Sequence, residues 1–315
     1  MKKDNMTKKR VAILGVTGML GSIMLDSFVQ SREFDVIATC RKQKEAKLFK
    51  HQYPKVAFRR FNAEKTSLKG LSDAIYGAQW VVNAIGVTKP NIHDDEADKI
   101  DRAIIVNAHF PHLLTKAAES SKAKIIQIAT DCVFSGQKGQ YLETDPHDCL
   151  DVYGKTKSLG EVFGDNIYHL RCSVIGPELK GHNSLLDWFL SQPKGAEVNG
   201  FTNHLWNGVT ALHFARICQG IIKKGVNLPH VQHVIPGNAI NKADMLKIIA
   251  KEYNRKDIVV RDMEAPLAID RTLSTVNKKL NRELWRLGGY AAPPTIAKMI
   301  KELAQYRFLG KDIKL

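Results

Sequence analysis

The first 170 residues of this 315-residue chain alternate between short apolar runs and amphipathic segments. The runs are rich in β-branched residues and mostly continuous, as expected of strands that are buried on both faces. They cover residues 11–14, 36–39, 56–61, 80–85, 125–129 and 167–170. Apolar residues at spacings of three and four predict helices over residues 19–29, 67–76, 103–119 and 153–163. The alternation predicts a doubly wound α/β fold, with parallel strands and helices on both faces.

A glycine-rich turn follows the first apolar run directly. Residues 15–21 read Gly-Val-Thr-Gly-Met-Leu-Gly and open the first predicted helix, the context in which a glycine fingerprint binds the pyrophosphate of a dinucleotide. Glycines allow a tight turn and a close backbone approach, and the helix N-terminus supplies free N–H groups and a positive dipole end. We therefore expect a Rossmann domain. Its cofactor contacts are predicted at Gly15, Thr17, Gly18, Met19, Leu20 and Gly21.

The strand–helix rhythm breaks after Arg171, where glycine and proline punctuate a mixed region. A helix over residues 211–222 and a strand over 231–235 are predicted to return to the main sheet. Further helices are predicted over 242–253 and from Pro294 onward, because a proline at the start of a helix loses no hydrogen bond. A second lobe, discontinuous in sequence, follows from this arrangement.

These patterns divide the chain into three parts. We expect a basic flexible tail at residues 1–10 and a Rossmann domain at 11–175, with a return segment at about 205–235. The rest, 176–204 and 236–315, is expected to form a smaller α/β substrate lobe.

The end of the second strand favours NADP(H) over NAD(H). Domains that prefer NAD carry Asp or Glu there to bind the ribose 2′-OH, whereas this chain has Arg41 and Lys42. A guanidinium would pair with a 2′-phosphate in forked geometry. The alternative is that Arg41 and Lys42 form an exposed basic turn that does not distinguish the two cofactors, so NAD(H) is kept as a second cofactor. Asn62, after the third strand, is predicted to contact adenine. Small residues after the fourth strand are predicted to lie against the cofactor: Ala84, Ile85 and Gly86.

A Tyr-x-x-x-Lys motif lies between the fifth and sixth strands, at Tyr153 and Lys157. At this spacing both side chains share one face of a helix. A phenol has a pKa of about 10 and a nearby ammonium favours its ionised form, so the pair is expected to exchange a proton close to neutral pH. Lys157 is also expected to hold the nicotinamide ribose, and Thr130 offers a hydroxyl at the end of the fifth strand.

The combination resembles the extended short-chain dehydrogenase/reductase family over nearly the whole chain. Residues 128–136, Ile-Ala-Thr-Asp-Cys-Val-Phe-Ser-Gly, are similar to the STDxVFxG segment of dTDP-4-dehydrorhamnose reductases. Residues 170–176, Leu-Arg-Cys-Ser-Val-Ile-Gly, are similar to the strand that follows in those enzymes. Residues 271–275, Arg-Thr-Leu-Ser-Thr, resemble their C-terminal RPxxS segment, with threonine in place of proline.

The resemblance implies a role for each motif residue. Thr130 would hydrogen-bond the substrate oxygen, Tyr153 would be the general acid, and Lys157 would position the cofactor and tune Tyr153. The implied reaction transfers hydride from NADPH to C4 of a nucleotide-linked 4-keto-6-deoxysugar, as in polysaccharide biosynthesis. The substrate diphosphate is anionic, and its candidate cations are Lys180, Arg271 and Lys278. His204 and Trp206 are candidates for lining the sugar or base pocket, or for packing between the lobes.

Departures from related families leave a second activity open. Sugar-nucleotide 4,6-dehydratases carry a Thr-Asp-Glu triplet, whereas Thr130 and Asp131 are followed here by Cys132, which disfavours dehydration. In reductoisomerases that make GDP-fucose, a cysteine at this offset works with a histidine, and His182 lies about where that histidine would fall. A combined epimerase and reductase is therefore an alternative. The other interpretation is that Cys132 is only a small buried residue at a variable position of the family.

A third interpretation is regulatory. Some proteins of this reductase type are cofactor-binding regulatory subunits with little activity of their own, such as the β subunit of methionine adenosyltransferase. The intact set of Thr130, Tyr153 and Lys157 favours an enzyme over such a subunit.

Composition excludes several other classes. The formal net charge of +15 is concentrated near the N-terminus without interleaved aromatic residues, so we expect an anionic small-molecule partner rather than nucleic acid. The five cysteines include no Cys-x-x-Cys pair and no metal-ligand spacing accompanies the histidines, so neither a disulfide framework nor a metal is expected. No apolar stretch is long enough to span a membrane, and a cytoplasmic location is expected. A homodimer is left open.

Overall fold

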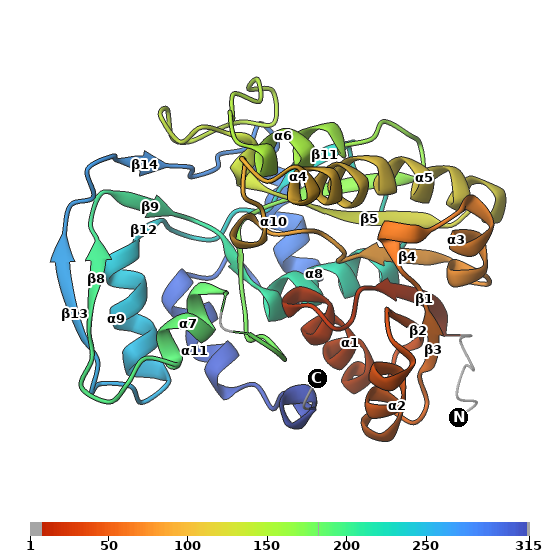
Figure 1. The fold of residues 1–315 in the computed structure, drawn as a ribbon, viewed down its shortest axis with the longest axis horizontal. Coiled ribbons are helices and arrows are strands. Elements are labelled where there is room, and N and C mark those ends of the chain that lie inside the picture. The colour runs from red at the N-terminus through yellow and green to blue at the C-terminus, as the bar shows by residue number, and fades with distance from the viewer. Residues whose placement is uncertain (1–7, 182, 314–315) are drawn as a thin grey trace.

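The computed structural model describes residues 8–181 and 183–313. Within them, seven parallel strands form the main sheet, in the order β11-β6-β5-β4-β1-β2-β3 (Figure 1). The strands are β1 (Lys9–Leu14), β2 (Phe34–Cys40), β3 (Ala57–Arg60), β4 (Trp80–Asn83), β5 (Lys124–Ala129), β6 (Ile167–Arg171) and β11 (Val231–His233). Each overlaps an apolar run of the sequence. In most of them, side chains buried on both faces leave a continuous hydrophobic signal, whereas β3, at the edge of the sheet, has no buried residue. The doubly wound parallel fold is confirmed.

The strand order reverses next to β1, which lies between β2 and β4. At such a switch point the connections from neighbouring strands leave toward opposite faces, and a crevice opens at the carboxyl ends of the strands. Gly15 follows β1 and Ala84 follows β4. The glycine turn therefore lies at the position where this fold binds ligands.

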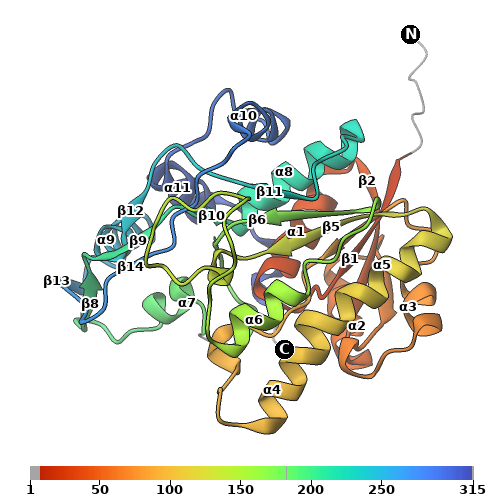
Figure 2. The ribbon, with the colours of Figure 1, turned by 90° about the horizontal axis from the view of Figure 1, so that it is seen from above.

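Helices cover both faces of the sheet (Figures 1 and 2). Successive residues of β1 point to opposite faces, so Val11 and Ile13 join one core cluster and Ala12 and Leu14 join the other. The first cluster includes side chains of α1 (Met19–Ser31), α2 (Gln43–Gln52) and α8 (Ala211–Lys224). The second includes side chains of α3 (Leu68–Ile75) and α5 (Phe110–Ser121). Near the start of α5 lie α4 (Ala97–Ala103) and α6 (Val152–Leu159).

Several helices differ from the expected pattern. The helix expected over residues 103–119 is divided by a π-helical turn, η3 (Ile104–His109), between α4 and α5. The helix expected over 153–163 ends at Leu159. Gly160, which follows it, lies so close to η3 that a Cβ there would come within 2.0 Å of the Asn107 carbonyl oxygen. Helix α2 carries few apolar side chains and so left little signal in the sequence.

The N-terminal boundary also differs. β1 begins at Lys9, so Lys9 and Arg10 belong to a strand rather than to the expected flexible tail. Lys9 donates a hydrogen bond to the backbone oxygen of Ile222, at 2.6 Å, and Arg10 pairs with Asp35. Residues 1–7 of the expected tail lie outside the described residues.

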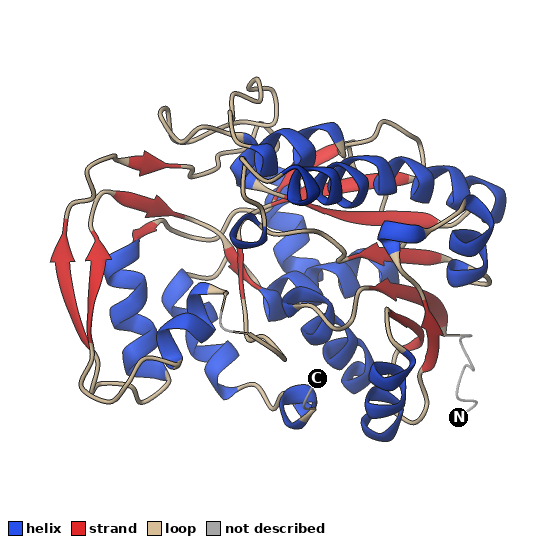
Figure 3. Cartoon of the chain, viewed as in Figure 1, coloured by secondary structure: helices blue, strands red, loops and turns tan. Residues whose placement is uncertain are grey.

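The second lobe mixes short strands and helices (Figure 3). One parallel pair joins β8 (Glu197–Phe201) to β13 (Val259–Met263), and β9 (His204–Trp206) lies between β12 (Ile240–Asn241) and β14 (Ile269–Asp270). The helices of this lobe are α7 (Leu185–Leu190), α9 (Lys242–Glu252) and α11 (Ile296–Gln305). β9 pairs within this lobe, and the return segment follows Trp206, close to the expected start at about residue 205.

The return segment and the C-terminal part tie the two lobes together. β10 (Val209–Thr210) pairs with β7 (Val174–Ile175), and α8 and β11 follow it in the chain. The later helix α10 (Lys278–Leu287) packs against α8. The turn η5 (Leu309–Asp312) reaches α1, where the Leu309 N–H donates to Asp26 at 3.1 Å. Parts of the expected substrate lobe therefore contact the Rossmann helices.

Candidate functional site

The glycine turn has the geometry that a pyrophosphate site needs. Gly15 has a φ of +82°, a left-handed conformation that favours glycine, and its N–H donates to the Thr39 hydroxyl at 3.1 Å. A Cβ on Gly21 would lie 2.2 Å from the Gly15 carbonyl oxygen, so only glycine lets α1 approach the turn this closely. The first turn of α1 contains no acidic side chain. Its N–H groups and dipole can therefore face an anion.

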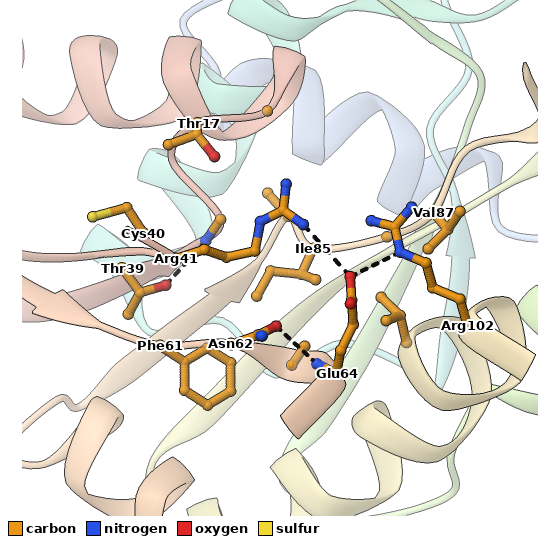
Figure 4. A pocket seen from close by; sticks show the side chains of 16 residues that line it. Thr17, Thr39, Cys40, Arg41, Phe61, Asn62, Glu64, Ile85, Val87 and Arg102 are labelled. Carbon is orange, nitrogen blue, oxygen red and sulfur yellow. Dashed lines mark hydrogen bonds and ion pairs between the residues drawn. The ribbon is translucent and has the colours of Figure 1, made fainter. Parts of the chain in front are cut away.

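A pocket of about 130 Å³ opens beside this turn and contains most of the predicted nucleotide contacts (Figure 4). Its lining includes Gly15, Thr17, Gly18, Arg41, Asn62, Glu64, Ala84, Ile85, Gly86, Val87 and Arg102. Lys42 is not among the lining residues. It is exposed, and its N–H donates to the Glu45 carboxylate at the start of α2, at 3.1 Å. Arg41 is therefore the cation after β2 that faces the pocket.

A second pocket, of about 330 Å³, continues from the first. The two share Gly18 and residues 84–87, so one groove runs from the nucleotide end past the glycine turn. The second pocket brings together residues predicted from separate motifs: Met19, Leu20, Thr130, Asp131, Cys132, Tyr153 and Lys157. The structure thus places the three expected catalytic side chains at the far end of the expected cofactor groove.

Thr130 ends β5 and begins the short turn η4 (Asp131–Val133). Its hydroxyl accepts a hydrogen bond from the Cys132 N–H at 3.1 Å and donates to Asp131 Oδ1 at 3.2 Å. Thr130 and Tyr153 line the same pocket, and the Thr130 side chain acts to lower the pKa of the phenol. The hydroxyl is therefore held in place beside the phenol.

Tyr153 and Lys157 lie one turn apart on α6. Burial raises the pKa of the Tyr153 phenol above its usual value, and Cys132 and Asp131 act in the same direction. Burial lowers the pKa of the Lys157 ammonium to about 8, against the raising effect of Glu161, and Lys157 Nζ donates to the Ile128 carbonyl at 3.1 Å. Burial is the largest cause of both shifts, so the Tyr153 phenol keeps its proton at neutral pH in this structure. The exchange of a proton between Tyr153 and Lys157 close to neutral pH stays a prediction.

Charged side chains from both lobes surround Asp131 and Cys132. Burial raises the pKa of Asp131, whereas Arg271 and Lys242 lower it. Burial and the Asp131 charge raise the pKa of the Cys132 thiol to about 12. Arg271 also donates to the Phe134 carbonyl at 2.9 Å. Cys132 is therefore a protonated thiol at neutral pH, and the cations of the second lobe lie close to the catalytic end of the groove.

Other predicted substrate residues lie elsewhere. Trp206 is buried in the hydrophobic core, and His204 Nε2–H donates a hydrogen bond to the Leu267 carbonyl at 3.0 Å. Lys180 pairs with Glu45 at 3.4 Å. Lys278 lines a separate cavity, of about 380 Å³, together with Asn207 and Arg282. His182 lies outside the described residues.

Two residues that line or support the pockets carried no sequence signal. Asn107, in the π-helical turn, holds both backbone groups of Val87, accepting from its N–H at 2.8 Å and donating to its carbonyl at 3.0 Å. Lys89 lines the catalytic end and pairs with Asp151 at 2.8 Å. Single polar residues such as these belong to no motif. A π-helical turn inside a predicted helix is the kind of irregularity that often marks a functional site.

Two further properties complete the description. Among the described residues, no group of three or more His, Cys, Asp or Glu side chains could hold a metal ion. In the same part of the chain, no helix is both long enough and apolar enough to cross a bilayer.

Comparison with families and curated proteins gives two kinds of relative. The family model described as RmlD substrate binding domain matches residues 9–272. The β subunit of methionine adenosyltransferase 2 from Mus musculus is 27% identical over 261 residues, which cover 79% of this chain and 74% of that protein. The match to the Bos taurus subunit covers only 43% of that protein. The dTDP-4-dehydrorhamnose reductase of Aggregatibacter actinomycetemcomitans is 37% identical over 83 residues, 26% of this chain and 27% of the enzyme.

Solved structures share the fold over nearly the full length. The dTDP-4-dehydrorhamnose reductase of Bacillus anthracis, in complex with NADP, matches with a TM-score of 0.70 at 18% identity, covering 94% of this chain and 99% of that one. The UDP-glucuronic acid 4-epimerase of Bacillus cereus, in complex with UDP-glucuronic acid and NAD, matches with a TM-score of 0.73 at 16% identity, covering 94% and 98%. At these identities the likeness is one of fold.

Proposed function

The chain belongs to the RmlD substrate binding domain family, and from this membership we propose that it is an NADPH-dependent reductase of a nucleotide-linked 4-keto-6-deoxysugar. The membership confirms the resemblance that the sequence motifs indicated. The observation that supports the activity most directly is the gathering of Thr130, Tyr153 and Lys157 in one pocket that continues into the nucleotide groove.

The residues present fit a dinucleotide. The space that a Cβ on Gly21 would fill is left free, the N-terminus of α1 faces the groove, and Arg41 lines the end where a 2′-phosphate would lie. When bound, the reduced nicotinamide supplies the hydride for the reaction. The chain itself supplies the groove that orients the dinucleotide and the groups that act on the ketone.

Tyr153 donates the proton in this proposal. As hydride reaches C4, the ketone oxygen gains negative charge, and the Tyr153 hydroxyl transfers its proton to that oxygen. The Thr130 hydroxyl, placed beside the phenol, turns its single proton from Asp131 to the same oxygen and fixes its position. Lys157 lies one turn away, and its ammonium stabilises the phenolate that remains after proton transfer. Arg271 and Lys242 provide positive charge where the substrate diphosphate would enter.

Turnover of a substrate panel tests the proposal. NADPH oxidation is measured with 4-keto-6-deoxyhexoses linked to dTDP, UDP and GDP, in parallel with a direct measurement of NADPH binding. We expect oxidation with at least one of the three and a product reduced at C4. Tight NADPH binding without turnover of any of them would contradict the reductase and favour a regulatory subunit.

The regulatory alternative is supported by the methionine adenosyltransferase β subunits, which match more of the chain than the curated reductase does. It is tested by adding the chain to a methionine adenosyltransferase catalytic subunit. A change in the activity or KM of that enzyme would favour it.

The epimerase alternative is less well supported, because the Cys132 thiol is protonated at neutral pH. A thiol acting as a base must be ionised. Reaction in deuterated water separates the two activities, since epimerisation exchanges hydrogen at the carbons beside the ketone and simple reduction does not. Exchange that is lost in Cys132→Ala would favour the epimerase.

A further inference from the structure

A carboxylate lies between two arginines in the nucleotide pocket (Figure 4). Glu64 Oε1 is 2.8 Å from Arg102 Nε and 3.5 Å from Arg41 Nη1. The three side chains come from separate elements: Arg41 follows β2, Glu64 lies in the turn η1 (Ala63–Lys65) after β3, and Arg102 lies in α4. Both guanidinium groups therefore share one carboxylate oxygen at the place where the adenosine half of a dinucleotide would lie.

The local backbone fixes the position of Glu64. Asn62 caps η1, because its side-chain oxygen accepts a hydrogen bond from the Glu64 N–H at 3.1 Å. The Glu64 side chain is 29% exposed, whereas those of Arg41 and Arg102 are 46% and 36% exposed. Ion pairs with this degree of exposure are weak individually. A more highly charged anion that enters the pocket can therefore displace the carboxylate from the arginines.

The two nicotinamide dinucleotides differ at the group that would meet this cluster. A phosphate carries about 1.5 to 2 negative charges at neutral pH, so the 2′-phosphate of NADPH would compete with Glu64 for the same N–H donors and would be repelled by it. The 2′-OH of NADH is a neutral donor, and a carboxylate accepts its hydrogen bond, as the acidic residue after the second strand does in NAD-binding domains. Glu64 is therefore expected to weaken the binding of NADPH and to strengthen the binding of NADH.

We infer that Glu64 sets the cofactor preference of this chain by competing with the 2′-phosphate of NADPH for Arg41 and Arg102 and by accepting the ribose 2′-OH of NADH. Arg102 is then a second phosphate-binding residue beside Arg41. The inference rests on the proposed function only in taking the groove to bind a nicotinamide dinucleotide. The preference between NADPH and NADH then depends on Arg41, Glu64 and Arg102 together, rather than on Arg41 alone.

Binding measurements on Glu64→Gln test the inference. Dissociation constants are measured for NADPH, NADH, 2′,5′-ADP and ADP. Since the substitution removes the charge and keeps the shape, we expect NADPH and 2′,5′-ADP to bind about three- to tenfold more tightly. NADH is expected to bind about threefold more weakly, because an amide is a poorer acceptor. Equal changes for NADPH and NADH, or no change for either, would overturn the inference.

Two further variants serve as controls. Glu119→Gln removes the same charge from an exposed site on α5, outside the pocket, and is expected to leave all four dissociation constants unchanged. Arg102→Gln is expected to weaken NADPH and 2′,5′-ADP about tenfold and ADP less than twofold, because ADP lacks the 2′-phosphate. An equal loss of affinity for 2′,5′-ADP and for ADP would overturn the role of Arg102. Should Glu64→Gln fail to fold, Glu64→Asp replaces it, with a smaller shift in the same direction.

The fragments separate this inference from the proposed function. 2′,5′-ADP and ADP contain neither nicotinamide nor sugar, so their ratio does not depend on reductase activity. A chain that turns over no sugar nucleotide but shows the predicted shift contradicts the reductase and supports the role of Glu64. A chain that turns over a sugar nucleotide with NADPH but lacks the predicted shift supports the reductase and contradicts the role of Glu64.

Discussion

Burial governs the protonation of Tyr153 and Lys157, the two side chains of α6 that line the groove. The Tyr153 phenol keeps its proton at neutral pH because desolvation raises its pKa and the nearby Asp131 carboxyl acts in the same direction. The Lys157 ammonium is destabilised by the same burial. A low-polarity pocket thus holds a proton donor ready and leaves the lysine close to its own titration point.

Tyr153→Phe separates proton donation from binding. The substitution removes one oxygen and keeps the ring, so NADPH affinity is expected to change less than twofold. Because general acid catalysis contributes about 10² to 10⁴ in rate, kcat is expected to fall by that factor. Single-turnover NADPH oxidation measures the chemical step directly. A variant with wild-type kcat would refute the role of Tyr153 as the acid.

The activity of the wild-type chain is expected to fall as pH rises above about 8. The pKa of Lys157 is lowered to about 8 by burial, so its ammonium, which the proposal uses to stabilise the phenolate, is charged below this pH and neutral above it. A profile of kcat against pH should show loss of one proton near pH 8. Lys157→Arg stays charged throughout this range, and its residual activity should lack the alkaline fall. A wild-type profile that is flat to pH 10 would contradict this assignment.

At the scale of elements, the π-helical turn η3 shapes the groove. Asn107 holds the backbone of Val87, which lines both pockets, and its own carbonyl oxygen lies against Gly160 at the end of α6. Two walls of the groove, the segment after β4 and the catalytic helix, therefore meet at one residue. The packing leaves no room for a side chain at position 160.

Gly160→Ala is expected to push α6 away from η3. Its Cβ would lie 2.0 Å from the Asn107 carbonyl oxygen, and overpacking of this kind costs about 1–3 kcal/mol of unfolding free energy. Chemical denaturation should show this loss, and kcat should fall because Tyr153 and Lys157 move with the helix. Gly70→Ala is the matched control, since its Cβ would meet no atom closer than 3.5 Å and alanine favours the helix. Equal stability of the two variants would disprove the close contact.

The elements also explain what the sequence could predict. Most strands of the main sheet were predictable because burial on both faces leaves an uninterrupted apolar run; the edge strand β3 has no buried residue. The glycine turn and the Tyr153 motif were predictable because their spacing has a local cause. Helix α2 is mostly exposed, and η3 interrupts a regular periodicity, so neither could be read from the pattern. Glu64, Arg102 and Lys89 face the groove only because elements distant in sequence meet there. The sequence allowed Trp206 either to line the sugar or base pocket or to pack between the lobes, and in the structure its side chain is buried in the core.

At the scale of the whole molecule, a buried charged network joins the catalytic helix region to the second lobe. Arg171, in β6, pairs with Glu161 just after α6, and its guanidinium also donates to His147 and His233 at 2.8 and 2.9 Å. His233 in turn contacts the Ser274 carbonyl, so the network reaches the segment that carries Arg271. Arg171 is 1% exposed and Glu161 is 9% exposed at their side chains. Neither residue lines the groove, and we expect the pair to hold the second lobe against the sheet.

Glu161→Gln is expected to lower the unfolding free energy at pH 7 by about 3–5 kcal/mol, because it leaves the Arg171 charge buried without its partner. Burial alone would raise the pKa of Glu161, but Arg171 outweighs it and the pKa is lowered. A carboxylate with a lowered folded pKa stabilises the fold above its unfolded pKa and loses this contribution as pH falls through the folded value. The difference between wild type and variant in urea denaturation should therefore be full at pH 7 and shrink below about pH 4.5.

The surface pair of Lys247 and Asp262 supplies the comparison. Its side chains are 45% and 53% exposed, so Asp262→Asn is expected to cost less than about 1 kcal/mol, since solvent screens such pairs. If Glu161→Gln costs no more than Asp262→Asn, the network does not hold the two lobes together. The other outcome is that Glu161→Gln costs the larger free energy of unfolding and also raises the KM for the sugar nucleotide, with little change in NADPH affinity. In that case the residues that stabilise the fold also set the position of the second lobe over the groove.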